Sequence, residues 1–208
     1  MSSMARRLAL TNKKETTTEN YNIILASNSP RRRELLAGLG LPYEVRIISG
    51  IDESYPAQMD AAEVPQYISQ QKARAYALTD SELLITADTI VCLDNEILGK
   101  PKDDAEARLM LSKLSGRTHQ VITGVTLTTT KWSHTFSCTS NVTFATLTEQ
   151  EIDYYIQNYH PLDKAGAYGI QEWIGYVGVT RLEGSYFNVM GLPVQRLYTE
   201  LKKLNIKI

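Results

Sequence analysis

The sequence predicts an α/β protein, and three observations carry that prediction. Short apolar runs alternate with amphipathic segments along residues 21–114, as expected where strands and helices alternate. Two long segments, 119–130 and 133–147, alternate apolar and polar residues in the manner of antiparallel strands. Hydrophobic residues make up 43% of the 208 positions and charged residues 22%, which is typical of a globular protein with a sizeable core.

The first elements follow from local signals. The segment "YNIILAS" at 21–27 is an apolar run and predicts a buried strand. Ser29 can cap a helix that has Pro30 at its first position. A second strand is expected over 43–49, and a helix over 63–78, whose apolar residues lie loosely on one face.

A hairpin and a helix are expected next. The β-branched run at 83–93 predicts a strand, and Asp94-Asn95 predicts the turn that leads into 96–101. Residues 103–116 predict a helix, because acidic residues stand at its start and a glycine at its end.

The second half of the chain begins with the two long strands. We expect them to pair antiparallel and to be joined near Lys131. Residues 148–159 open with a Thr-x-x-Glu capping box and predict a helix. A Gly-rich region at 164–191 gives few periodic signals, and a last helix is expected over 192–204. A division into two lobes is expected near residues 115–145.

Composition limits the compartment and the partners. The formal net charge of −1 argues against a general nucleic-acid-binding surface. Cys92 and Cys138 lack metal-ligand spacing and fit a reducing, cytoplasmic compartment. No apolar stretch approaches the ~20 residues of a membrane span, so no membrane partner is expected. Residues 1–20 are polar and Thr-rich, which predicts a disordered tail before one domain over 21–208.

The segment "LASNSPRRRELLAGLG" at 25–40 raises the first functional question. It predicts a helix N-terminus that carries Ser27, Ser29 and three arginines, Arg31 to Arg33. Free backbone N–H groups, hydroxyls and guanidinium forks can together hold phosphate groups. The alternative is a capped surface helix with solvated arginines. The segment lacks the glycines of a P-loop or a dinucleotide fingerprint.

Asp88 is the second anomaly, because it stands inside an otherwise apolar strand. An unpaired buried charge there would cost several kcal/mol, so the carboxylate must be paired, bound to metal or placed at a cleft wall. Facing a phosphate cradle, it can serve as general base to a water or hold a divalent ion. The alternative is a bulge residue or an ordinary salt-bridge partner.

Three further segments point toward the same cleft. Lys100 stands in a tight Gly-Lys-Pro turn, from which its side chain can project. Lys72 is one of several helix lysines and would ordinarily be solvated. "DKAGAYGIQ" at 163–171 packs small residues around Gln171, whose amide can read the edge of a base. His119 is expected to be structural, and the histidines give no zinc spacing.

Together these segments resemble the Maf family of nucleoside triphosphate pyrophosphatases, over about Ile23 to Leu204. The resemblance implies an elongated mixed sheet with flanking helices and two lobes around a cleft, related to the inosine-triphosphate pyrophosphatases. It also implies hydrolysis of a nucleoside triphosphate to the monophosphate and pyrophosphate with a divalent metal, Mg²⁺ or Mn²⁺. The segments that carry it are "SNSPRR", "KARA", "ADTIV", "GKP", "LSGRTHQVITGV", "DKAGAYGIQ" and "GSY…VMGLP".

The resemblance also implies roles for individual residues. The catalytic aspartate falls on Asp88, and Glu53 matches a cleft acid that binds metal or substrate, so these two are the candidate metal ligands. The phosphate-facing residues implied by the family are Ser27, Arg31, Arg32, Lys72 and Lys100.

Three positions resemble the branch of the family that acts on dTTP and UTP. These are Arg31, Thr89 and Gln171, where the branch acting on 7-methyl-GTP has tryptophan, glutamine and glutamate. Three alternatives stay open: another modified nucleotide such as 7-methyl-GTP, a non-enzymatic regulator of cell division, and a nucleic-acid binder. The last would use Arg31 to Arg33 with four basic residues of the tail, Arg6, Arg7, Lys13 and Lys14. A nucleotide is the expected partner, and a homodimer is one assembly left open.

Overall fold

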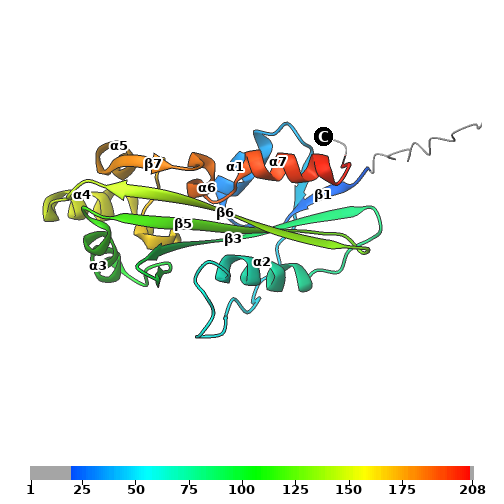
Figure 1. Cartoon of the computed structure of the whole chain (residues 1–208), viewed down its shortest axis with the longest axis horizontal. Helices are drawn as coiled ribbons and strands as arrows, with labels where there is room; N and C mark the ends of the chain where they lie inside the picture. Colours follow the sequence, from blue (N-terminus) through cyan, green and yellow to red (C-terminus); the bar gives the residue numbers. More distant parts are fainter. Residues whose placement is uncertain (1–19, 207–208) are drawn as a thin grey trace, which may run out of the picture.

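The computed structural model describes residues 20–206, and the tail predicted over residues 1–20 therefore lies almost wholly outside the described residues. Within the described part, one mixed sheet has seven strands in the order β2-β1-β3-β5-β6-β7, with β4 beside β3. The long strands run along the longest axis of an elongated molecule, and helices lie on both sides of them (Figure 1). The predicted elongated α/β class is confirmed.

A parallel unit begins the chain. Strand β1 pairs in parallel with both β2 and β3, so it lies between them in the sheet. Ser29 caps α1, as predicted: its hydroxyl accepts a hydrogen bond from Arg32 N at 3.4 Å. The elements of this unit are β1 (Asn22–Leu25), α1 (Pro30–Ala37), β2 (Tyr43–Val45), α2 (Val64–Arg74) and β3 (Glu82–Leu93).

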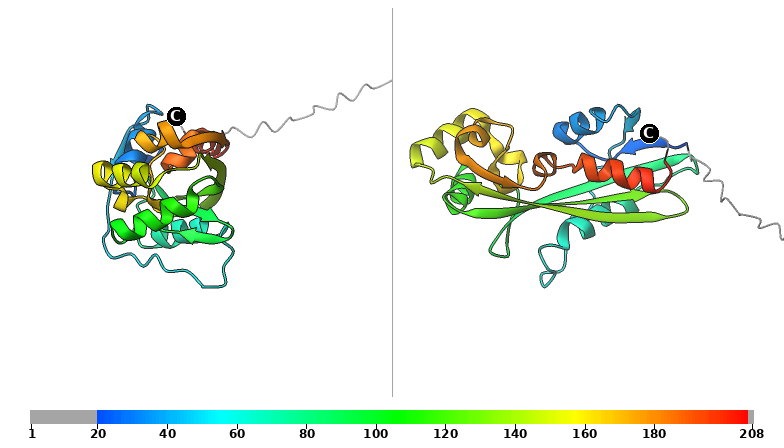
Figure 2. Two further views of the ribbon diagram at one scale, coloured as in Figure 1. Left: turned by 90° about the vertical axis from the view of Figure 1, so that its left-hand side faces the viewer. Right: turned by 45° about the horizontal axis from the view of Figure 1, so that its top comes forward.

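Strand order 2-1-3 places α1 and α2 on opposite faces of the sheet. The chain moves outward from β1 to β2 and then returns past β1 to β3, so the two crossover helices cover different faces. Alternate residues of β1 confirm this: Ile23 and Leu25 pack in the core under α1, whereas Ile24 packs beneath α2. Figure 2 shows the same two layers from one end and in a view tilted by 45°. The carboxyl end of β1 is therefore a topological switch point, where ligands bind in α/β sheets.

The predicted hairpin and the helix after it are present. Asp94 and Asn95 both have positive φ, 50° and 66°, which is the backbone of a tight two-residue turn. This turn joins β3 to β4 (Glu96–Leu98). Helix α3 (Asp104–Leu114) follows, and the Asp103 side chain caps it by accepting a bond from Glu106 N.

The antiparallel half of the sheet holds the two long strands expected from the sequence. Strands β5 (Thr118–Thr128) and β6 (Ser133–Phe144) pair over their whole length, and β5 also pairs with β3. Helix α4 (Glu149–Tyr159) begins with the predicted capping box of Thr148 and Glu151. The rest of the chain forms short elements: η1 (Pro161–Asp163), η2 (Ala165–Ala167), α5 (Trp173–Gly178), β7 (Val179–Glu183), α6 (Tyr186–Met190) and α7 (Val194–Lys203).

Two apolar cores give the molecule its lobes. One core lies among α3, α4 and the far halves of the long strands, and the other lies under α1 and α7. Strand β5 enters both cores, with Val121 in the first and Val125 in the second. The expected division near residues 115–145 is therefore not a break in the chain, because the same strands build both lobes.

Two predicted elements are shorter than expected. The strand expected over 43–49 ends at Val45. Among the described residues it pairs with β1 alone, and the last hydrogen bond between them is donated by Arg46 N to Leu25 O, just before the chain turns from β1 into α1. The helix expected over 63–78 ends at Arg74, and the hydroxyl of Tyr76 instead donates to Arg46 O and fixes the loop after β2.

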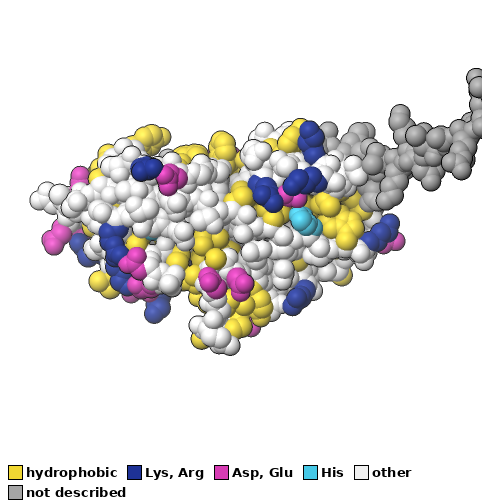
Figure 3. Space-filling view, viewed as in Figure 1, with side chains coloured by type: hydrophobic (Ala, Val, Ile, Leu, Met, Phe, Trp, Pro, Cys, Tyr) yellow, Lys and Arg dark blue, Asp and Glu magenta, His cyan; other side chains and the backbone are white. Residues whose placement is uncertain are grey.

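The surface carries charges of both signs, as expected from the formal net charge of −1. Basic and acidic side chains lie interspersed on the face shown in Figure 3. No helix in the described range is long and apolar enough to cross a membrane.

Candidate active site

A gap in the sheet forms the candidate site. Pairing of β1 with β3 ends at Leu25 and Ile85, and pairing of β4 with β3 begins only at Val91. Residues 86–90 of β3 thus have a strand partner, β5, on one side only within the described chain. A cleft of about 780 Å³ opens here, and all nine residues predicted from the sequence line it: Ser27, Arg31, Arg32, Glu53, Lys72, Asp88, Thr89, Lys100 and Gln171.

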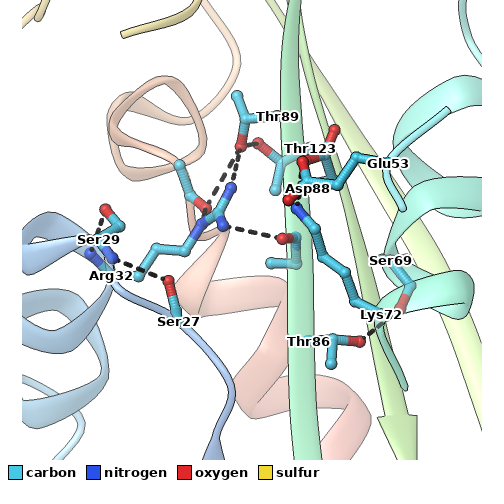
Figure 4. Close-up of polar contacts among 12 residues, drawn as sticks. Ser27, Ser29, Arg32, Glu53, Ser69, Lys72, Thr86, Asp88, Thr89 and Thr123 are labelled. Carbon is cyan, nitrogen blue, oxygen red and sulfur yellow. Dashed lines mark hydrogen bonds and ion pairs between the residues drawn. The ribbon is translucent and has the colours of Figure 1, made fainter. Parts of the chain in front are cut away.

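Asp88 is paired across the cleft floor with Lys72. In β3, Thr86 bonds to α2 through Ser69 O, and Asp88, two residues later, faces the same helix. Lys72 Nζ lies 2.8 Å from Asp88 Oδ1, and the two side chains are only 14% and 13% exposed (Figure 4). Lys72 is therefore not a solvated helix lysine. The largely buried carboxylate has the charge partner that its position in the sequence requires.

Glu53 approaches the same ammonium group from the loop between β2 and α2. Its Oε2 lies 3.1 Å from Lys72 Nζ, and its side chain is about half exposed. Lys72 thus stands between two carboxylates, as Figure 4 shows. No group of three or more His, Cys, Asp or Glu residues clusters for a metal in the described residues.

These two carboxylates fit a divalent cation bound together with a phosphate. Asp88 and Glu53 already contact one common cation, the Lys72 ammonium. Carboxylate oxygens suit hard ions such as Mg²⁺ and Mn²⁺, and Mg²⁺ sites often combine one or two carboxylates with phosphate oxygens. The donor set is of the expected chemistry for the metal that the sequence resemblance implies.

Gly124 allows α2 to lie close to this floor. It is the β5 residue paired with Asp88, and a Cβ there would lie 2.4 Å from the backbone of Pro65 and Gln66. The first turn of α2 therefore rests directly on the strand. This contact sets the distance between α2 and the sheet, and so the distance over which Lys72 reaches Asp88.

Arg32 fixes the opposite wall of the cleft. Its guanidinium donates to Gly191 O at 2.8 Å, Ala87 O at 2.8 Å and Thr89 Oγ1 at 3.0 Å (Figure 4). Burial lowers the pKa of this guanidinium, and nearby Asp88 partly offsets that effect. Arg32 and Thr89 together tie α1 to the open edge of β3 and to the turn after α6.

The other two arginines of the SPRRR segment point elsewhere. Arg31 lines the cleft and donates to Asp163 Oδ2 at 2.9 Å. Arg33 donates to Ser27 O and binds the loop before the helix. The Ser27 side chain is buried, and its Oγ accepts a bond from Ser29 N at 3.2 Å. Three consecutive arginines thus have three different contacts.

Lys100 and Gln171 lie on the wall formed by the second lobe. Lys100 is exposed and forms no ion pair with any described residue. The Gln171 side-chain oxygen is buried without a hydrogen-bond partner among the described atoms. The glycines near it pack on the chain itself: a Cβ on Gly169 would meet the Glu172 carboxyl group, and one on Gly166 would meet Val91.

Two charged residues of the cleft, Asp163 and Lys164, were not predicted from the sequence. Their signal is a pair of opposite charges at the entry of the Gly-rich segment. His119, in contrast, is structural as predicted. It is buried, bonded to the Tyr168 hydroxyl at 2.7 Å, and burial lowers its pKa to about 4.

The fold and the site define an α/β protein whose cleft combines a paired carboxylate with several cations. The chain belongs to the family described as Maf-like protein, whose model matches residues 22–204. A relative from Phocaeicola vulgatus named dTTP/UTP pyrophosphatase is 63% identical over 188 residues, covering 89% of this chain and 97% of the relative. A relative of the same name from Bacteroides thetaiotaomicron is 58% identical with the same coverage. One from Flavobacterium psychrophilum is 48% identical over 88% of this chain and 94% of its own length.

Solved structures with similar shape come from proteins called HAM1. One from Coxiella burnetii covers 88% of this chain and 99% of its own, with a TM-score of 0.46 and 16% identity. The Staphylococcus aureus Ham1 protein covers 60% of this chain and 72% of its own, with a TM-score of 0.44 and 20% identity.

Proposed function

We propose that this chain hydrolyses dTTP and UTP to the nucleoside monophosphate and pyrophosphate. The observation that carries the proposal is the match along almost the full length of relatives that bear the name dTTP/UTP pyrophosphatase. The geometry supports it, because a cleft with a largely buried carboxylate, Asp88, and several cations suits attack on a polyanionic substrate.

Asp88 is the proposed general base. Its carboxylate accepts a proton from a water whose oxygen attacks the α-phosphorus, while the bond from that phosphorus to the bridging oxygen breaks. Lys72, at 2.8 Å, holds the carboxylate in place. The electron pair of the broken bond leaves with the pyrophosphate.

Charge on the leaving pyrophosphate needs stabilisation, and two groups are suited to supply it. Lys100 lies at the cleft and pairs with no acidic side chain of the described residues, and Arg31 reaches the cleft from α1. When bound, a divalent cation, Mg²⁺ or Mn²⁺, supplies further charge neutralisation of the phosphates. Asp88 and Glu53 are the proposed residues to hold it.

Gln171 is proposed to select the base. A primary amide can donate and accept at once, which matches the O4 and N3–H edge of uracil and thymine. Cytosine presents the inverse pattern, and a mismatched buried pair costs on the order of 1–3 kcal/mol. Gln171 lines the cleft, and its buried side-chain oxygen accepts no hydrogen bond from any described group, which supports this role.

The test is a panel of nucleotides with added magnesium or manganese. We expect high kcat/KM for dTTP and UTP and low values for CTP and ATP, measured as pyrophosphate release. Gln171→Glu should weaken turnover of both pyrimidine substrates, since a carboxylate loses the donor. A ranking led by 7-methyl-GTP would overturn the proposal.

The setting of the activity is also proposed. We place the enzyme in the cytoplasm, because both cysteines are free thiols and its proposed substrates are intracellular nucleotides. Residues 21–208 act as one domain in this proposal, which leaves a homodimer open as its assembly.

A further inference from the structure

We infer that Arg31 and Lys164 form a subsite for a phosphate group, and that the carboxylate of Asp163 fills this subsite in the free protein. The inference rests on the proposed function, since a phosphate would come from the triphosphate or from the pyrophosphate product. Arg31, Asp163 and Lys164 all line the cleft that contains Asp88.

The Asp163 carboxylate bridges two cations that come from different lobes. Its Oδ2 lies 2.9 Å from Arg31 NH1, and its Oδ1 lies 2.7 Å from Lys164 Nζ. Arg31 belongs to α1, which packs on one core, whereas residues 161–167 pack on the other core. One carboxylate thus occupies the position between the lobes where two cations converge. A phosphate group offers the same oxygens with more negative charge.

Lys164 is built into the protein and does not depend on Asp163. Its side chain is only 9% exposed, and its Nζ also contacts Glu172 Oε1 at 3.1 Å. Glu172 is itself held by the Tyr155 hydroxyl, which accepts a bond from Gly169 N at 2.9 Å. If Asp163 leaves, Lys164 keeps this second carboxylate and stays at the cleft wall.

Asp163 can leave at low cost. Its side chain is 56% exposed, so it can rotate into water. Water screens the ion pairs of a carboxylate that is this exposed, even though its two cationic partners are more buried. A phosphate that carries more charge and accepts from the guanidinium fork can therefore replace it. In this arrangement Asp163 competes with the ligand and lowers its affinity.

The test is calorimetric titration of the full chain with inorganic pyrophosphate, without nucleotide or added metal. Asp163→Asn should bind pyrophosphate about fivefold more tightly than the wild type, which corresponds to about 1 kcal/mol. Asp94→Asn is the matched control. It removes the same charge from a carboxylate that also pairs with an arginine, Arg117, but at a hairpin turn outside the cleft. We expect this control to bind like the wild type.

Lys164 supplies the second arm. Lys164→Gln should weaken pyrophosphate binding, and in the double variant it should cancel the gain of Asp163→Asn. Lys164→Arg keeps the positive charge and should bind pyrophosphate like the wild type. Unchanged or weaker binding by Asp163→Asn, or an equal gain in the Asp94→Asn control, would overturn the inference. Because no nucleotide is present, this outcome is independent of whether dTTP is hydrolysed, and a failed nucleotide panel would not be mistaken for a failed subsite.

Discussion

Replacing Gly124 by alanine places a methyl group where α2 touches the sheet. The new Cβ would lie 2.4 Å from Gln66 N and from Pro65 C, and both are backbone atoms that cannot rotate away. Ordinary contact needs about 3.5 Å, so the helix must rise by about 1 Å. The Ser69 hydroxyl bonds to Thr126 at 2.8 Å and resists this movement.

Two quantities should change as a result. Overpacking of this kind lowers the free energy of unfolding by about 1–3 kcal/mol, measurable by urea denaturation. The shift also draws Lys72 away from Asp88, now 2.8 Å apart, and a displacement of about 1 Å near reacting groups can lower kcat/KM about 10²-fold.

A matched control separates this effect from a general effect of alanine. Gly38 ends α1 with φ of −62°, and a Cβ there would lie 3.4 Å from Leu35 O. Gly38→Ala should therefore keep both stability and activity. If Gly124→Ala unfolds like the wild type and turns over dTTP at the same rate, α2 does not depend on this contact. If only stability falls, the height of α2 does not control the Lys72–Asp88 pair.

The remaining predictions concern the base, the arginine clamp and pH. Asp88→Asn should lower kcat for pyrophosphate release by about 10²–10⁴-fold, and retention of a tenth of the activity would remove Asp88 from the mechanism. Arg32→Ala should raise KM, lower kcat and cost about 1–3 kcal/mol of stability, because Ala87 O and Gly191 O lose their donor; unchanged denaturation curves would contradict this. Burial lowers the pKa of His119 from 6.5 to about 4, so the unfolded chain binds a proton that the folded chain does not. The contribution of His119 to the free energy of unfolding is then fully present above pH 6.5, and it falls by up to about 3 kcal/mol toward pH 4. In His119→Gln the free energy of unfolding, measured by denaturation across that range, should depend less steeply on pH.

Local chemistry explains why much of the fold could be predicted. Ser29 and Thr148 are caps whose hydroxyls serve the helix that follows them, and Asp94-Asn95 is a turn whose residues tolerate positive φ. Each of these signals acts within a few residues, so it can be read without knowing what packs nearby. Strand β7 gave no such signal, because its residues lie in a Gly-rich segment and only pairing with β6 makes them a strand.

The candidate site was predictable as a set of residue types but not as a set of contacts. Asp88 attracted attention because a charge in an apolar strand needs a partner. That partner is Lys72, and it reaches Asp88 only because α2 packs across the sheet. The residues around Lys72 do not specify this packing. Asp163 and Lys164 were missed because their proposed role depends on their position beside Arg31, which lies more than a hundred residues away in the chain.

The edge of β3 over residues 86–90, which lacks a strand partner on one side in the described chain, affects how the protein behaves in solution. An uncovered strand edge can recruit a strand from another chain and begin aggregation. Here the Arg32 guanidinium already donates a hydrogen bond to Ala87 O, and Asp88 and Lys72 place charges next to this edge. The residues proposed to handle the nucleotide therefore also guard the edge against β-pairing between molecules. Variants that remove these charges should lose solubility together with activity.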